Sequence, residues 1–211
     1  MQENSKSFEE LAEIKSLMMK STRFLSLSGL SGVAAGIVAL ICTYIALLIF
    51  KNENGGTLFQ SFSCEGRYFS NDGLKLMIVN GLSALALAIL FGFYFTWRKA
   101  RKNSQKVFTP VAIKMFIHLG IPLFVGGIFV FASILYSDYY LIAPLTLIFY
   151  GMALLNGSRH TIADVRYLGL SEILIGLIAL FLPGYGLLFW VIGFGLLHII
   201  YGTAMHFKYD R

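Results

Sequence analysis

The most constraining feature of this sequence is a succession of apolar runs that are too long for the helices of an ordinary soluble domain. The first run, residues 24–50, contains no charged residue, and about 20 apolar residues suffice to cross the hydrocarbon core of a bilayer. The apolar part of a cleaved secretion signal is only about 7 to 15 residues long, so the run predicts a membrane span. Five further runs predict spans at approximately residues 76–97, 111–135, 140–156, 168–182 and 185–207.

Composition supports lipid as the main solvent of the chain. Of its 211 residues, 57% are hydrophobic and only 13% are charged, whereas a soluble domain carries roughly 25% charged residues. Such a chain has too few polar side chains to cover its surface in water. We therefore expect an all-α integral membrane bundle, with six transmembrane helices in residues 24–207 and a short tail at 208–211.

Two of the predicted spans, 140–156 and 168–182, are short for a hydrocarbon core about 30 Å thick. They could form a tilted pair in a thinned region of the bilayer. Alternatively, the segment at 168–182 could be re-entrant and cross only part of the membrane.

Lysine and arginine residues predict the orientation. Most of them lie in the N-terminal segment, in the loops after the second and fourth spans and in the C-terminal tail, and only Lys51, Arg67 and Lys75 lie on the opposite side. Positive residues hold loops in the cytoplasm, so both termini are predicted to be cytoplasmic, with an outer loop at 51–73. This bias also accounts for the net charge of +6, and no basic-aromatic pattern indicates a nucleic-acid partner.

The N-terminal segment, residues 1–23, is predicted to contain an amphipathic cytoplasmic helix. Ser7 and Glu10 form a capping box, and apolar residues then recur at helical spacing over residues 7–22. This helix could lie on the membrane, pack under the bundle, or bind a cytoplasmic protein partner.

Glycines spaced seven apart recur in the three spans that run outward. Seven residues is close to two helical turns, so each pair shares one face. In addition, GLSGVAAGIVALI (29–41) aligns with GLSEILIGLIALF (169–181). Either the chain contains three related hairpins packed through small residues, or the match is chance among 21 glycines. The glycines predicted to pack helices together are Gly29, Gly32, Gly36, Gly120, Gly127, Gly169 and Gly176. Gly32 and Gly36 form a GxxxG motif, which permits a homo-oligomer without establishing one.

Ionisable residues inside a membrane are costly and are candidates for function. Four of them are predicted to lie in the inner half of the bundle: Lys114 and His118, one helical turn apart, together with Glu172 and His198. They could satisfy one another structurally, form a proton or ion relay or a small-solute site, or bind a cofactor. Two histidines could ligate a b-type haem, but they are too few to specify a metal site.

The sequence contains no nucleotide-binding glycine loop, serine-hydrolase elbow or zinc-protease motif. We therefore expect that the protein is not an enzyme and that it holds no cofactor or metal. Asn80, a polar residue in the second span, is expected to make an interhelical hydrogen bond.

Two stretches, RFLSLSGLSGVAAGIVALI (23–41) and VRYLGLSEILIGLIALFLPGYGLLFWVIGFGLLHIIYG (165–202), resemble an uncharacterised family of small multi-span membrane proteins from Bacteroidetes-type bacteria. The two stretches cover about a quarter of the chain. The last predicted hairpin, with Gly176, Pro183 and Gly202, also loosely resembles the repeat unit of HdeD-type acid-resistance membrane proteins. The resemblance implies a protein of the bacterial inner membrane and no particular activity.

These observations favour a membrane component with an interaction, stress-response or regulatory role. The alternatives are a channel or transporter for a small solute or proton, and a membrane haem or redox protein.

Overall fold

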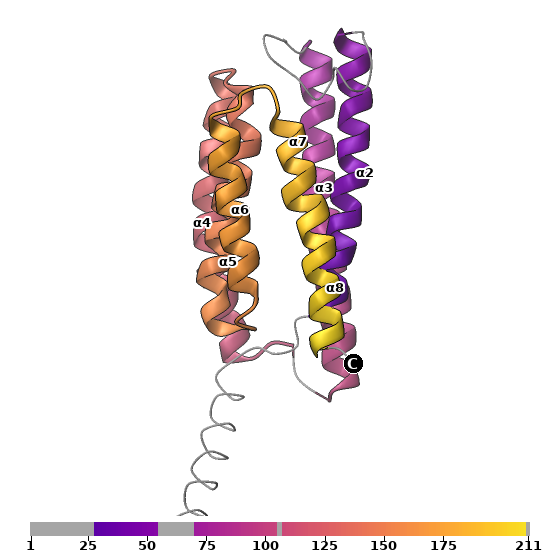
Figure 1. Ribbon diagram of the computed structural model, residues 1–211, viewed down its shortest axis with the longest axis vertical. Coiled ribbons are helices and arrows are strands. Elements are labelled where there is room, and N and C mark those ends of the chain that lie inside the picture. Colours follow the sequence, from indigo (N-terminus) through magenta and orange to yellow (C-terminus); the bar gives the residue numbers. More distant parts are fainter. Residues whose placement is uncertain (1–27, 55–69, 105–106, 210–211) are drawn as a thin grey trace, which may run out of the picture.

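The computed structural model describes residues 28–54, 70–104 and 107–209, and all regular structure in these ranges is helical. The predicted amphipathic helix at 7–22 and most of the outer loop lie outside the described residues. Figure 1 shows the helices as long, roughly parallel rods. The helices are α2 Gly29–Asn54, α3 Asn71–Lys102, α4 Pro110–Leu135, η2 Tyr139–Leu141, α5 Ile142–Gly157, η3 Ser158–His160, α6 Val165–Leu180, α7 Gly186–Trp190, η4 Val191–Leu197 and α8 His198–Tyr209.

Five of the rods are long and apolar enough to cross a membrane: α2, α3, α4, the η2–α5–η3 segment and the continuous α7–η4–α8 rod. This confirms the prediction of a helical membrane protein. The remaining rod, α6, has 16 residues and is therefore about 24 Å long, short of a hydrocarbon core of about 30 Å. It corresponds to the predicted span at 168–182, whose full crossing the sequence left open.

The rods form two groups that lie next to each other in Figure 1: α4, α5 and α6 in one, and α2, α3 and the α7–η4–α8 rod in the other. We call them the central group and the terminal group. A cluster of buried residues crosses between them, in which Leu154, Val165 and Leu168 of the central group pack with Met205 of α8. The interface between the groups is therefore a place where polar residues can be kept from lipid and from water.

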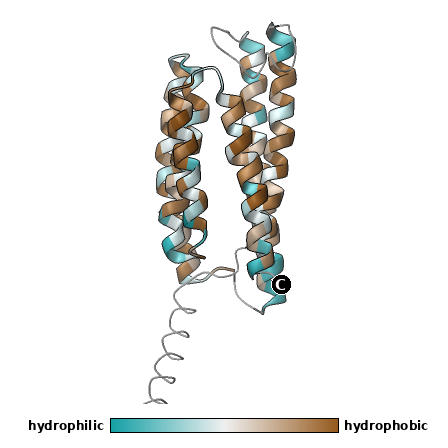
Figure 2. Ribbon diagram, viewed as in Figure 1, coloured by the Kyte–Doolittle hydropathy of each residue, from teal (hydrophilic) through white to brown (hydrophobic). Residues whose placement is uncertain are grey.

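Apolar residues run along the rods of both groups, as the brown colour in Figure 2 shows, and many of them are exposed. On α3 and α4, Leu90 and Phe124 are 64% and 73% exposed. Apolar surfaces this continuous are uncommon on soluble monomers, and they suit contact with lipid. Polar residues gather toward the ends of the rods, where headgroups and water begin.

The start of α2 lies beside the end of α8. A methyl group added at Gly29 would lie 2.5 Å from the carbonyl oxygen of Gly202 and would overlap the backbone nitrogen of His206. The last turn of α8 also contains Lys208. The first described rod thus begins, and the last one ends, at the same end of the bundle.

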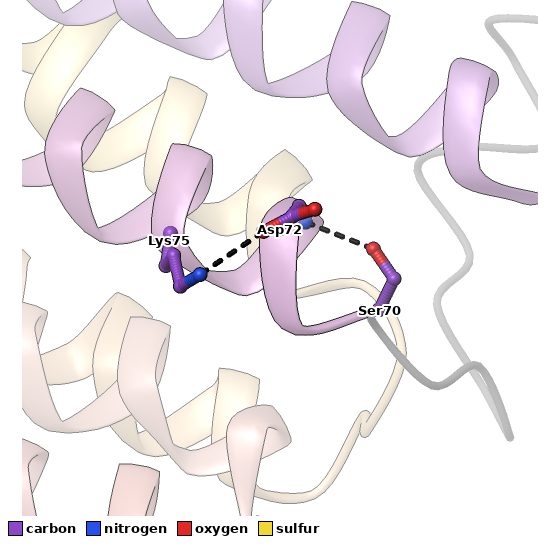
Figure 3. Close-up of polar contacts among 4 residues, drawn as sticks. Ser70, Asp72 and Lys75 are labelled. Carbon is purple, nitrogen blue, oxygen red and sulfur yellow. Dashed lines mark hydrogen bonds and ion pairs between the residues drawn. The ribbon is translucent and has the colours of Figure 1, made fainter.

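The sequence placed the second span at 76–97, but α3 starts at Asn71 and continues to Lys102. Ser70 caps the helix by accepting a hydrogen bond from the backbone nitrogen of Gly73 at 3.0 Å, and Lys75 forms a 3.0 Å ion pair with Asp72 (Figure 3). The cap explains the early start, because a serine oxygen satisfies a backbone donor that the first turn leaves unpaired. Residues at both ends of the predicted outer loop, 51–73, are therefore helical, since α2 also extends to Asn54.

Asn80 makes the interhelical contact expected of it. Its amide nitrogen donates a 2.9 Å hydrogen bond to the carbonyl oxygen of Cys42 on α2. The bond joins α2 to α3 within the terminal group.

Candidate buried acid–base site

Glu172 and His198 are the only buried carboxyl and imidazole groups in the ranges that the structure describes. Glu172, on α6, is 0% exposed, and His198, the first residue of α8, is 4% exposed. Oε1 of Glu172 lies 3.3 Å from Nδ1 of His198. The pair therefore joins the central group to the terminal group, and two members of the predicted cluster do meet.

Tyr150 of α5 completes a three-residue chain. Its hydroxyl lies 2.8 Å from Nε2 of His198, while Nδ1 of His198 also lies 3.0 Å from the carbonyl oxygen of Gly193. Because both neighbours of Nδ1 are acceptors, we assign the proton of a neutral imidazole to Nδ1. Nε2 is then the acceptor for the Tyr150 hydroxyl proton. The aromatic ring of Phe194 packs against both Tyr150 and His198.

The site coincides with a change in helix type. The sequence predicted an uninterrupted span at 185–207, but residues Val191–Leu197 form the π-helical segment η4. π-helical turns are rare and often mark functional positions. Here the wider turn brings the side chain of His198 to the carbonyl oxygen of Gly193, five residues earlier.

Gly193 also makes room for the carboxyl group. A methyl group at this position would lie 2.6 Å from Oε2 of Glu172. The absence of a side chain at Gly193 therefore lets Glu172 approach the helix backbone beside His198.

Within the part of the chain that the structure describes, the buried carboxyl group of Glu172 lacks the hydrogen bonds that would stabilise a negative charge. Among the described residues, neither carboxylate oxygen of Glu172 has a hydrogen-bond partner. An ionised carboxylate in such a place costs several kcal/mol unless a positive charge lies beside it. An ion pair between Glu172 and His198 would supply that charge, and it would add an electrostatic attraction between the two groups of helices to the apolar contacts at Met205.

The other two residues of the predicted cluster lie elsewhere. His118 is exposed, and its ring stacks on that of His160 at a centroid distance of 4.8 Å. The charge of Lys114 acts on the same His160. The expectation of a single cluster of four is wrong: His118 and Lys114 point toward η3 at one end of the bundle, while Glu172 and His198 face the interface between the groups.

The seven glycines that were predicted to pack helices together fall into two sets, those that contact a neighbouring helix and those that do not. Gly29, Gly32, Gly36, Gly169 and Gly176 all touch a neighbouring helix, as predicted. A methyl group added at Gly120 or Gly127, in contrast, would meet nothing within 4 Å among the described residues. The packing prediction is wrong for these two, and it is Gly126, against Phe149, that lets α4 approach α5.

The predicted likeness between residues 29–41 and 169–181 has a counterpart in the contacts. Added methyl groups at Gly29 and Gly202 would lie 2.5 and 2.7 Å from each other's carbonyl oxygens, and those at Gly169 and Gly151 would lie 2.8 and 2.6 Å away. The α2–α8 pair and the α6–α5 pair thus approach through equivalent backbone contacts.

The partner helices also match in sequence. Ile148-Phe149-Tyr150-Gly151 on α5 corresponds to Ile199-Ile200-Tyr201-Gly202 on α8, and Ile148 and Ile199 contact Gly176 and Gly36 in the same manner. Span three does not share this contact, so two helix pairs, rather than three hairpins, carry the likeness.

Sequence reasoning missed Tyr150 and His160. Tyrosine is common at the ends of spans, so Tyr150 gave no particular signal. The sequence does contain one signal that could have identified it, because the Tyr-Gly pair at 150–151 recurs at 201–202.

A haem site on His118 and His198 is not favoured by this arrangement. Both ring nitrogens of His198 have polar neighbours within the protein, and ligation would displace Tyr150. Among the described residues, no group of three or more His, Cys, Asp or Glu side chains is placed to hold a metal ion.

Comparison with known protein families, curated protein sequences and solved structures gave no match to this chain.

Proposed function

We propose that this chain is a regulatory protein of the bacterial cytoplasmic membrane, in which protonation at Glu172 and His198 changes how the central and terminal groups associate. The observation that carries the proposal is the complete burial of the Glu172 carboxyl group, with the imidazole of His198 at 3.3 Å. Such a pair is sensitive to the gain of one proton because no water is at hand to solvate the charge that remains.

The proposal includes six membrane crossings with both termini in the cytoplasm. The proximity of Gly29 and Gly202 supports an even number of passes, and so does the pairing of α6 with α5 along its length (Figure 1). A short α6 is tolerable in a bilayer that thins locally. The lysines and arginines near the ends of α3 and α8 favour that end as the cytoplasmic one.

The test uses the full chain in lipid nanodiscs, with both native cysteines replaced by serine and spin labels at Lys102→Cys on α3 and Tyr167→Cys on α6. Distances between the labels are measured by pulsed electron resonance near pH 8 and near pH 5, the range in which histidine charge changes. We expect the distance distribution to change with pH in the parent protein. Glu172→Gln, which mimics the protonated acid, should give the low-pH distribution at both values.

The matched control is Asp72→Asn, which removes an acid that is 87% exposed at the side chain. It should leave the pH response unchanged. A distribution that ignores pH, or a pH response that persists in Glu172→Gln, contradicts the proposal.

A second function is favoured by one specific observation. Tyr150 is hydrogen-bonded to His198, and Oε1 of Glu172 lies 3.3 Å from the other side of the same imidazole, so the three groups line a route along which protons could be relayed across part of the membrane. Proteoliposomes that contain a pH-sensitive dye separate the two functions. Proton flux that is abolished by Glu172→Gln supports the relay, whereas a pH-dependent distance change without flux supports regulation.

A further inference from the structure

A second cluster of ionisable groups lies outside the buried site, where the start of α4 meets η3. Met115 and Leu119 of α4 pack over Gly157, which places the first turns of α4 against the end of α5. This packing brings His118 onto His160 and sets Lys114 and Arg159 beside them. We call Lys114, His118, Arg159 and His160 the basic patch.

Among the described residues, no acid compensates the positive charge of the basic patch. The charges that act on His160 are those of His118, Lys114 and Arg159, and no carboxylate of the described residues is among them. The nearest acid along the chain, Asp164, is engaged by Lys208 at 2.6 Å and by the Tyr209 hydroxyl at 3.0 Å. Four cationic or protonatable groups held together in this way repel one another unless an anion lies between them.

The surroundings of the patch indicate which anion. On α4, Ile113 and Ile117 flank Lys114 and are 52% and 56% exposed. They continue into the apolar surface of the rods, so the patch sits where the lipid-facing surface ends. A ligand that suits both features has a phosphate group and acyl chains, and basic residues between helices at this level are suited to anionic headgroups.

We propose that the basic patch binds the phosphate of one anionic phospholipid, whose acyl chains lie along Ile113 and Ile117. Arg159 provides paired donors for the phosphate oxygens, while Lys114 acts as a point charge. The stacked histidines offer additional hydrogen-bond donors to the phosphate, and Lys114 and Arg159 face the same site.

The test measures lipid binding to the full chain in a non-ionic detergent by native mass spectrometry. The probes are dioleoylphosphatidylglycerol and dioleoylphosphatidylcholine, with inorganic phosphate as a competitor. We expect one phosphatidylglycerol to bind more tightly than phosphatidylcholine. The double variant Lys114→Gln/Arg159→Gln should weaken phosphatidylglycerol binding roughly thirtyfold, since each of the two basic residues near a membrane surface contributes about 1 kcal/mol.

The matched control is Arg98→Gln/Lys102→Gln, which removes the same two charges from exposed positions on α3. It should leave the affinity within about twofold of the parent value. Equal loss in both double variants, or equal binding of the two lipids, overturns the proposal. Phosphate that displaces the lipid at low millimolar concentration would assign the patch to a soluble anion and would overturn it as well.

All four substituted side chains are exposed, so the variants are expected to fold. Their thermal unfolding without added lipid provides the check. A Lys114→Gln/Arg159→Gln variant that unfolds like the parent and still binds phosphatidylglycerol at parent affinity refutes the assignment.

Discussion

The α2–α8 and α6–α5 pairs approach through the same backbone contacts but differ in the side chains added to that framework. Glu172 of α6 corresponds to Gly32 of α2, and His198 of α8 corresponds to Leu147 of α5. The framework alone therefore needs neither an acid nor an imidazole at these positions. Replacing a buried ion pair by apolar residues is often neutral or stabilising, so the presence of both groups at one interface supports the proposed function.

The largest expected effect comes from making the two pairs alike at one position. His198→Leu copies the residue of α5 and leaves Glu172 buried without its partner. We expect a loss of about 3–5 kcal/mol in the free energy of unfolding, measured by denaturant titration in detergent.

Adding Glu172→Gln to His198→Leu should restore much of that stability, with a coupling energy of about 1–3 kcal/mol. If the losses in unfolding free energy were additive, the acid and the imidazole would not interact in the folded protein. The difference between the two helix pairs at these positions would then have no energetic consequence.

The glycine framework itself is tested by adding one methyl group to each pair. Gly202→Ala and Gly151→Ala each place a methyl group against backbone atoms, 2.5 Å from the Val33 nitrogen and 2.6 Å from the Gly169 oxygen. Each should reduce stability by about 1–3 kcal/mol. Thermal unfolding in detergent measures the change.

Gly127→Ala serves as the control for this experiment, because its methyl group meets no described atom within 4 Å. Its effect should stay within about 1 kcal/mol of zero and can be stabilising, since alanine favours helix. A loss in only one of the two pairs would show that their contacts are not equivalent.

The two helix pairs are also compared at their corresponding tyrosines, Tyr150 of α5 and Tyr201 of α8. Tyr150→Phe removes the proton donor of Nε2 of His198, which should cost about 1–2 kcal/mol. The Tyr201→Phe variant changes the corresponding residue of α8, which is only half-buried and therefore has access to other partners. Unfolding of both variants in the same detergent gives the ranking, and a larger loss for Tyr201→Phe would contradict it.

The smallest effect is expected at Asp164, where the loop before α6 is tied to α8. The hydrogen bond from Lys208, with that from Tyr209 in support, lowers the pKa of Asp164 below its ordinary value of 3.8, against the opposing effect of burial. An acid with a lowered pKa stabilises the folded state above its unfolded pKa and ceases to do so as the pH falls through its folded pKa. Asp164→Asn should therefore destabilise slightly near neutrality and approach the parent below about pH 4.

Unfolding midpoints at several pH values check this prediction. The Asp72→Asn variant, at an exposed acid on the opposite end of α3 from Lys102, is the control. A difference between Asp164→Asn and the parent that grows on acidification would have the wrong sign and would reject the ion-pair explanation.

The helical membrane architecture was predictable, because long apolar runs have few alternatives in lipid. The pairing of Glu172 with a histidine was among the sequence-based alternatives, since costly groups inside a membrane tend to satisfy one another, although Lys114 and His118 were equally open as its partners. The separation of Lys114 and His118 from Glu172 was not predictable. Apart from Lys114 and His118, span three is almost uniformly apolar, so its pattern does not indicate which face turns toward the bundle.

The early start of α3 and the π-helical segment show two further limits. A hydropathy pattern marks where lipid begins and does not detect that Ser70 caps the helix outside it. The change of helix type at η4 depends on the contacts of Gly193 and His198 with α6. Such contacts between distant parts of the chain leave no periodic trace in the sequence.

The contact between α2 and α8 also sets an order for assembly during synthesis. The α5–α6 hairpin can close as soon as its two neighbouring segments leave the ribosome, and α2 can likewise pack on α3 early. The glycine face of α2, in contrast, has to wait for almost the whole chain before α8 exists. Closing contacts between distant segments is slow, and an unfinished chain would expose the Gly29–Gly36 face of α2 to other proteins in the membrane. A truncated protein that lacks α8 is therefore expected to be a preferred substrate for membrane proteases, even though its other helices are intact.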